Sequence, residues 1–178
     1  MVKGQNIACF DVYYYGDYAW ACYLVFKNNS SEKIIAKYLE KITPVNKYIS
    51  GEFYKRELPC LLEVYAKVRE EISLAIVDGF VLLERGKNGL GGYLYEALNQ
   101  KIPVIGVAKT FHQGCENYRK IYRGKSLKPL FVSCIGIELD YAAQYIKNLA
   151  GENRIPNILR EADRLTRLDE GNCLASID

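Results

Sequence analysis

Two aspartates and one glutamate occupy positions from which their carboxylates could act together. Asp11 lies inside an apolar strand-like run, Asp78 follows the apolar run 74–77 just before Gly79, and Glu57 opens the helical pattern between them. A carboxylate within an apolar run is costly to bury unless it is paired or holds a metal. Oxygen ligands of this kind suit Mg²⁺, with Mn²⁺ as an alternative, and such ions support phosphodiester hydrolysis by activating water and stabilising the leaving oxygen.

Other kinds of chemistry have weaker support in the sequence. The single histidine, His112, formally permits a Ser-His-Asp triad, but no G-x-S-x-G motif accompanies it, and a multi-histidine metal site is impossible. The six cysteines form no C-x-x-C pair, which favours reduced core thiols over a zinc site. A structural explanation of the acids stays open, because strand aspartates can cap turns and Glu57 can favour a helix dipole.

The elements that must position these acids follow from hydrophobic periodicity. Two strand-like runs are joined by the turn residues Gly16 and Asp17, and a third, alternating run follows them. A helical pattern, with Pro59 expected in its first turn, precedes the buried run that ends at Asp78. The predicted strands are 7–15, 18–26, 33–42, 74–79, 103–107 and 130–135, and the predicted helices are 56–71, 90–99, 140–149 and 158–168; residues 111–128 are expected to be a loop with a helical turn.

This element order predicts an α/β fold. Three antiparallel strands followed by parallel strands imply a mixed sheet with helices on both faces, in the order of the ribonuclease H-like fold. In that topology the first strand and the strand after the first helix lie side by side and parallel. Asp11 and Asp78 would then come abreast on the sheet, where Glu57 could join them.

Length and composition bound the class of protein. The 178 residues, 49% hydrophobic and 25% charged, predict one globular domain over residues 1–170 and a frayed tail over 171–178. No apolar run is long enough for a membrane span, so we expect a cytoplasmic monomer without a membrane partner. The net charge of +3 is too small to indicate nucleic acid by itself.

Six motifs in order and spacing resemble the endonuclease V family, a nuclease family with the ribonuclease H-like fold, over nearly the whole chain. These are Phe-Asp-Val-Tyr-Tyr-Tyr-Gly-Asp at 10–17, Tyr-Ile-Ser-Gly at 48–51 with Arg-Glu-Leu-Pro at 56–59, Val-Asp-Gly at 77–79 with Gly-Leu at 89–90, Ile-Pro-Val-Ile-Gly-Val-Ala-Lys at 102–109, Phe-Val-Ser at 131–133, and Arg-Ile-Pro at 154–156 with Arg-Glu-Ala-Asp at 160–163.

The resemblance implies roles for the matched catalytic positions. Asp11, Glu57 and Asp78 would hold the divalent metal, and Lys109 would face the scissile phosphate; the plainer interpretation of Lys109 is a solvated lysine at a strand end. The implied reaction is Mg²⁺-dependent hydrolysis 3′ of a deaminated base, chiefly inosine, in DNA or RNA, as in nucleic-acid repair.

The resemblance also implies a substrate-binding loop and a base pocket. Tyr48 and Ile49, with Gly51 in the same motif, would form the wedge that fills the gap left by an everted base; alternatively, both side chains pack on the core. Gly79 and the neighbouring backbone would accept the flipped base, because reading a base edge needs close main-chain approach.

The sequence departs from the family pattern where the family carries histidines. Residues 79–87 lack both histidines and the proline of the corresponding family segment, residues 133–136 lack a later Ser-Pro-Gly-His, and Ser50 replaces the wedge proline. We therefore expect altered metal use, rate or substrate preference, with Glu138 or Asp140 as a hypothetical late ligand. Two alternatives stay open: a non-catalytic nucleic-acid-binding relative, and a nuclease without inosine preference.

A basic stretch and many tyrosines complete the candidate nucleic-acid features. Most of the fifteen tyrosines are expected to be structural. The basic residues could contact phosphates and make binding sensitive to salt, or could form a solvated loop. They are Arg119, Lys120, Arg123, Lys125 and Lys128.

Overall fold

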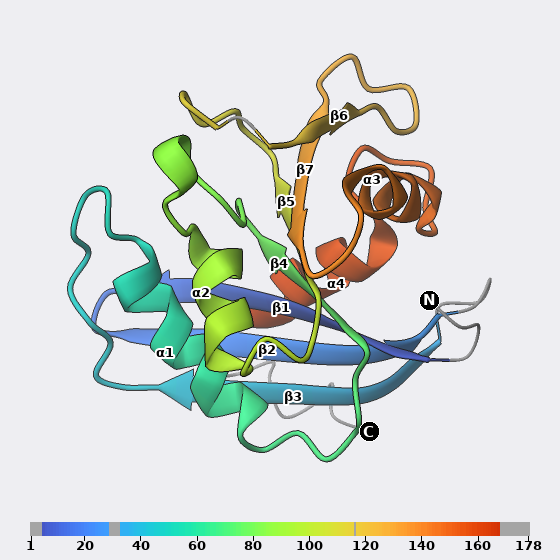
Figure 1. The fold of residues 1–178 in the computed structure, drawn as a ribbon. Coiled ribbons are helices and arrows are strands. Elements are labelled where there is room, and N and C mark those ends of the chain that lie inside the picture. The colour runs from blue at the N-terminus through green and yellow to red at the C-terminus, as the bar shows by residue number, and fades with distance from the viewer. Residues whose placement is uncertain (1–4, 29–32, 116, 168–178) are drawn as a thin grey trace.

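The computed structural model describes residues 5–28, 33–115 and 117–167, and it is built around one mixed seven-stranded sheet (Figure 1). The strand order is β3-β2-β1-β4-β5-β7-β6. No helix in the described part of the chain is long and apolar enough to cross a membrane. The elements are β1 (Asn6–Tyr15), β2 (Tyr18–Lys27), β3 (Ile34–Ile42), α1 (Tyr54–Tyr65), β4 (Leu74–Asp78), η1 (Glu84–Gly86), α2 (Leu90–Ala97), β5 (Val104–Ala108), β6 (Arg119–Ile121), β7 (Leu130–Ile135), α3 (Leu139–Asn148) and α4 (Asn157–Thr166).

The directions of the strands confirm the predicted mixed sheet. β1, β2 and β3 form an antiparallel meander, β1 pairs with β4 in parallel, and β4 pairs with β5 in parallel. The first strand and the strand after the first helix are therefore neighbours, as predicted. β7 then reverses direction and pairs antiparallel to β5.

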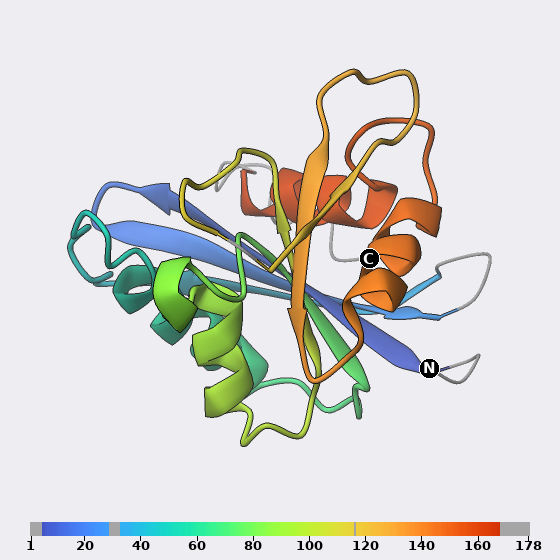
Figure 2. The same ribbon diagram turned by 45° about the horizontal axis from the view of Figure 1, so that its top comes forward.

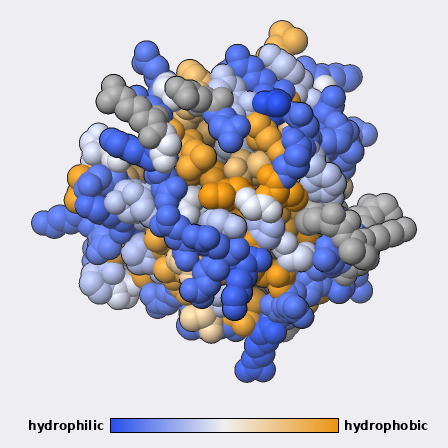
Figure 3. Space-filling model, viewed as in Figure 1, coloured by the Kyte–Doolittle hydropathy of each residue, from blue (hydrophilic) through white to orange (hydrophobic). Residues whose placement is uncertain are grey.

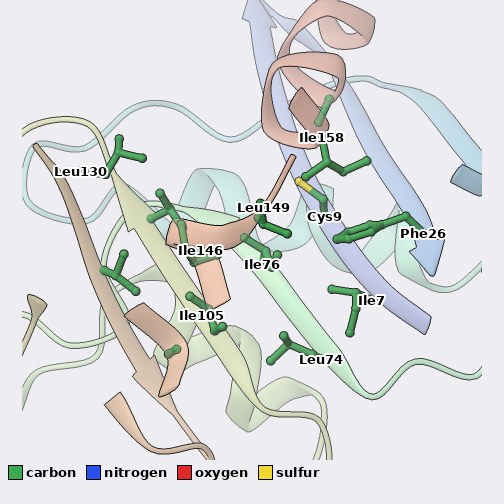
Figure 4. Packing of buried hydrophobic residues seen from close by; sticks show 14 of the residues in the cluster. Ile7, Cys9, Phe26, Leu74, Ile76, Ile105, Leu130, Ile146, Leu149 and Ile158 are labelled. Atoms are coloured by element: carbon green, nitrogen blue, oxygen red, sulfur yellow. The ribbon is translucent and has the colours of Figure 1, made fainter. Parts of the chain in front are cut away.

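Helices cover both faces of the sheet, with α1 and α2 on one face and α3 and α4 on the other (Figures 1 and 2). Alternate residues of the central strands belong to two separate hydrophobic cores, one on each face of the sheet, because successive side chains of a strand point to opposite faces. Ile7 and Ile76 pack with Ile146 and Ile158 beneath α3 and α4 (Figure 4). Each fully buried side chain of this size stabilises the fold by roughly 1.5–3 kcal/mol.

Two details of the predicted elements are wrong. The segment 111–128 contains the edge strand β6, and its described residues contain no helix. β6 has only three residues and pairs on one side with β7, so its sequence carries little periodicity of its own. The first helix begins at Tyr54 and ends at Tyr65, which places Pro59 in its second turn rather than its first.

The face that carries α1 and α2 is mostly hydrophilic, with apolar side chains gathered in a hollow over β5 and β7 (Figure 3). A separate apolar cluster stands where β4 and β5 end. Its buried members are Phe80, Ala108, Cys115 and Phe131, and Tyr118 packs against them.

Candidate active site

The parallel pairing of β1 with β4 brings Asp11 and Asp78 abreast. Cys9 lies opposite Ile76 in this ladder. Asp11 and Asp78 follow these residues by two positions each, so they share the register and the same face of the sheet. This face is the one covered by α4, and Asp78 is at the carboxyl end of β4, where open α/β sheets place their ligands.

Lys109 pairs with Asp78 at the end of the neighbouring strand. Asp78 lies opposite Val107 in β5, which ends at Ala108, so Lys109 leaves the sheet beside the carboxylate. Its Nζ donates a hydrogen bond to Asp78 Oδ2 at 2.6 Å. Burial opposes the charge on Lys109, but the Asp78 carboxylate outweighs it and raises the pKa of the lysine. Lys109 is thus a charged partner of the acidic site and not merely a solvated strand-end lysine.

Asp11 is largely buried, and Thr166 of α4 hydrogen-bonds it. Thr166 Oγ1 donates to Asp11 Oδ2 at 2.6 Å, and Thr166 is itself fully buried. Burial raises the pKa of Asp11 to about 6, with further contributions from the negative charges of Asp78 and Asp163, while the Thr166 hydrogen bond opposes the rise. Thr166 is not among the residues predicted from the sequence, because nothing in its local sequence distinguishes it.

Glu57 is a buried carboxylate with an unsatisfied oxygen. The side chain is 5% exposed, and Glu57 Oε2 has no hydrogen-bond partner. Burial, followed by the charges of Asp78 and Asp11, raises its pKa well above the ordinary value. A role confined to the helix dipole does not explain this burial, because a dipole interaction is available to an exposed glutamate.

The donor set formed by Asp11, Glu57 and Asp78 fits a hard divalent cation in its chemistry. Carboxylate oxygens are the ligands that Mg²⁺ takes, and a buried, unpaired Glu57 oxygen is a group that a cation would satisfy. Within residues 5–28, 33–115 and 117–167, no three His, Cys, Asp or Glu side chains already stand together as a metal cluster. Binding an ion would therefore require these side chains to close around it.

The hypothesis of a late ligand at Glu138 or Asp140 is wrong. β7 runs antiparallel to β5, so residues that follow Ile135 lie beside Val104, at the opposite end of β5 from Lys109. Glu138 caps α3 by accepting a hydrogen bond from the Tyr141 amide, and Asp140 pairs with Arg119 at 2.5 Å.

Asp163 of α4 is the carboxylate that approaches the site instead. Its charge acts on the pKa of both Asp11 and Lys109, and it forms an ion pair with Arg167 at 2.9 Å. The backbone carbonyl of Asp163 also lies 3.0 Å from Thr166 Oγ1.

Tyr48 and Ile49 project from the loop before α1. They are 60% and 49% exposed, so the alternative that they pack on the core is excluded. Pro59 has no N–H to donate to the carbonyl of Lys55, four residues earlier, and the Asn46 side chain donates to that carbonyl at 2.8 Å. The Lys55 carbonyl, which has no helical partner because of the proline, thus anchors the loop to α1 through Asn46. Gly51 lies at an exposed turn of the same loop.

Gly79 lies at the turn that follows β4. Its φ of +117° is readily adopted only by glycine, and its N–H donates to the Val107 carbonyl at 3.1 Å. The amide of Gly79 is therefore engaged in the sheet. Phe80, which follows, is buried in an aromatic cluster with Tyr118 and Phe131, at the position where the family carries its first histidine.

The predicted basic stretch divides into residues with different roles. Arg123 is 5% exposed, and its guanidinium donates to the carbonyls of Lys147, Asn153 and Gly151 at 3.1–3.2 Å. It is therefore a structural cap at the end of α3, and its guanidinium is engaged by backbone carbonyls. Arg119 is exposed and held by Asp140.

Comparisons with known proteins agree with this fold. The family model described as "Endonuclease V" matches residues 1–164. An endonuclease V from Nostoc sp. is 30% identical over 138 residues, which is 66% of this chain and 62% of that protein. The match therefore spans less than two thirds of the Nostoc protein.

Solved structures support the fold. The crystal structure of endonuclease V from Streptomyces avermitilis superposes with a TM-score of 0.81 and 24% identity, covering 93% of this chain and 81% of that one. Endonuclease V from Ciona intestinalis, solved in complex with a 23mer DNA containing an inosine followed by a ribo-adenosine, gives a TM-score of 0.77 at 22% identity, covering 93% and 85%. The predicted ribonuclease H-like fold is confirmed. Because the family model spans nearly all of the sequence, the chain belongs to the endonuclease V family.

Proposed function

We propose that the chain is a metal-dependent endonuclease that hydrolyses a phosphodiester bond 3′ of a deaminated base, chiefly inosine, in DNA or RNA. The observation that carries the proposal is the shared register of Asp11 and Asp78, with Glu57 buried nearby and Lys109 Nζ at 2.6 Å from Asp78. Family membership and the inosine-containing DNA bound by the Ciona relative support the substrate class.

Each residue has a distinct part in the proposed reaction. Asp11, Glu57 and Asp78 would hold Mg²⁺, or Mn²⁺ in its place, which when bound supplies an activated water and stabilises the leaving oxygen. Lys109 would turn from Asp78 toward the scissile phosphate and neutralise part of its charge. Thr166 holds one oxygen of Asp11 and so fixes the direction in which the other points.

Substrate recognition would come from the loop before α1 and from the turn after β4. Tyr48 and Ile49 are exposed and would fill the gap left by a flipped base, with Gly51 turning the loop behind them. The Gly79 amide is already paired, so the base would be read by neighbouring backbone and by the aromatic cluster around Phe80.

The direct test is cleavage of labelled single strands, in DNA and RNA form, that differ only in one inosine or guanine. The reactions would contain Mg²⁺, Mn²⁺ or EDTA, with the Asp78→Asn variant as the control for contaminating nuclease. We expect inosine-dependent cutting that needs a metal and disappears in the variant. Cutting of both strands at equal rates would leave a nuclease without inosine preference.

A binding-only relative is the second candidate, and one observation favours it. The segment after β4 lacks the histidines of the family pattern. Inosine-selective binding with no cutting in either metal would establish this function and refute hydrolysis.

A further inference from the structure

A groove of about 1060 Å³ opens beside the acidic site, between the β6–β7 loop and the segment that joins α3 to α4. Lys125 and Ser126 line one wall, Glu152 and Arg154 the other, and Arg160 of α4 the end. The two connecting segments lie side by side in both ribbon views (Figures 1 and 2). The volume is at the upper limit of ordinary small-ligand pockets, roughly 300–1,000 Å³, so an extended ligand fits it better than a single small anion.

Contacts between the two walls hold the groove in its shape. Arg123 joins the two walls, because it belongs to the β6–β7 loop and its guanidinium donates to the carbonyls of Gly151 and Asn153. Gly124 adopts φ +59°, and a Cβ at that position would stand 2.0 Å from the Glu152 carbonyl oxygen. The backbones of the two walls are thus in close contact at Gly124, and the groove does not depend on a ligand to bring them together.

The groove carries a net positive charge. Lys125, Arg154 and Arg160 line it, against the single carboxylate of Glu152. Lys125 and Arg160 are exposed, and neither pairs with a carboxylate anywhere in the described chain. Arg154 bonds backbone carbonyls, including that of Pro129 at 2.7 Å, so its positive charge is not neutralised there.

The groove adjoins the acidic site. Ile155 lines both the groove and the small pocket that holds Asp11, Asp78 and Lys109. Arg154 also donates a hydrogen bond to the backbone carbonyl of Lys109. A strand with one phosphate at Lys109 would therefore have neighbouring phosphates beside the basic groove.

We propose that this groove binds the backbone phosphates of the strand that enters the active site, through Lys125 and Arg160 with Arg154 between them. The proposal rests on the proposed function for the identity of the strand. The contacts are sequence-independent, because phosphates carry no base information.

Salt-dependent binding tests the groove separately from catalysis. A short fluorescent single strand would be titrated with the full chain in EDTA at several salt concentrations, with and without one inosine. The groove variant is Lys125→Ala/Arg160→Ala. The matched control is Arg69→Ala/Lys101→Ala, which removes the same two residue types from exposed positions before β4 and β5, at the far end of the sheet.

We expect the slope of log affinity against log salt to fall by about 1.4 in the groove variant, at about 0.7 for each phosphate contact on a single strand, and to stay unchanged in the control. An equal loss on strands with and without inosine supports the groove. Inosine-selective binding with an unchanged slope overturns the groove and leaves the proposed function standing. A groove-dependent slope without inosine selectivity supports the groove and counts against the proposed lesion preference. Stronger binding of polyglutamate than of the strand overturns the assignment to nucleic acid.

Discussion

Replacing Asp11 with asparagine should stabilise the metal-free protein while abolishing its activity. The side chain is nearly isosteric, and its amide oxygen can still accept the Thr166 hydrogen bond. The change removes a carboxylate whose pKa rises from 3.8 to about 6 in the fold because of burial and neighbouring negative charge. A rise of about two pKa units corresponds to about 3 kcal/mol of free energy of unfolding.

The sign of the effect follows from proton binding. Between about pH 4 and about pH 6 the folded protein keeps a proton on Asp11 that the unfolded chain has released, so stability falls as the pH rises through this interval. Asparagine cannot ionise. The variant and the parent should therefore be equally stable below about pH 4, and the variant should be more stable by about 3 kcal/mol above about pH 6.

The measurement is urea unfolding in EDTA across this pH range, followed by fluorescence of the single tryptophan, Trp20. Asp17→Asn makes the same chemical change at an exposed turn and is the matched control. A parent–variant difference that is flat with pH, or a variant less stable than the parent at high pH, would refute the reasoning. In Mg²⁺ the same Asp11→Asn protein should cut no inosine strand.

Three further predictions follow from the same contacts. Thr166→Val removes the hydrogen bond that lowers the pKa of Asp11, so in the same urea series the loss of stability should extend to higher pH than in the parent; an unchanged profile would exclude the bond. Arg123→Leu leaves the buried carbonyl of Leu149 unpaired, together with part-buried carbonyls such as that of Gly151. An unpaired buried carbonyl costs about 1–3 kcal/mol, so urea unfolding should show a loss of at least this size, whereas the exposed Lys125→Leu should show little change. Tyr48→Ala should leave the melting temperature unchanged because the side chain is 60% exposed, yet reduce the ratio of inosine to guanine strand affinity; a ratio equal to the parent's would remove Tyr48 from recognition.

Hydrophobic periodicity and turn chemistry by themselves determined most of the sheet. The hairpin at Gly16 predicted the pairing of the first two strands, and the buried run before Asp78 predicted a parallel strand beside the first. That arrangement predicted that Asp11 lies beside Asp78. These signals are local, because burial on one or both faces imposes a pattern on each strand separately. The family motifs added the roles expected of Glu57 and Lys109.

Tertiary structure alone decided which side chains meet the acids. Thr166 contacts Asp11 across 155 residues of sequence because α4 packs over β1, and no local pattern records that approach. Because β7 runs antiparallel to β5, the residues that follow β7, including Glu138, lie at the end of the sheet opposite the acidic site. Glu138 therefore cannot act as a ligand there. Arg123 lies in a basic stretch, so its residue type suggested phosphate binding, but in the structure it is buried and caps the end of α3. Residue type alone does not reveal which backbone carbonyls the folded chain leaves unpaired.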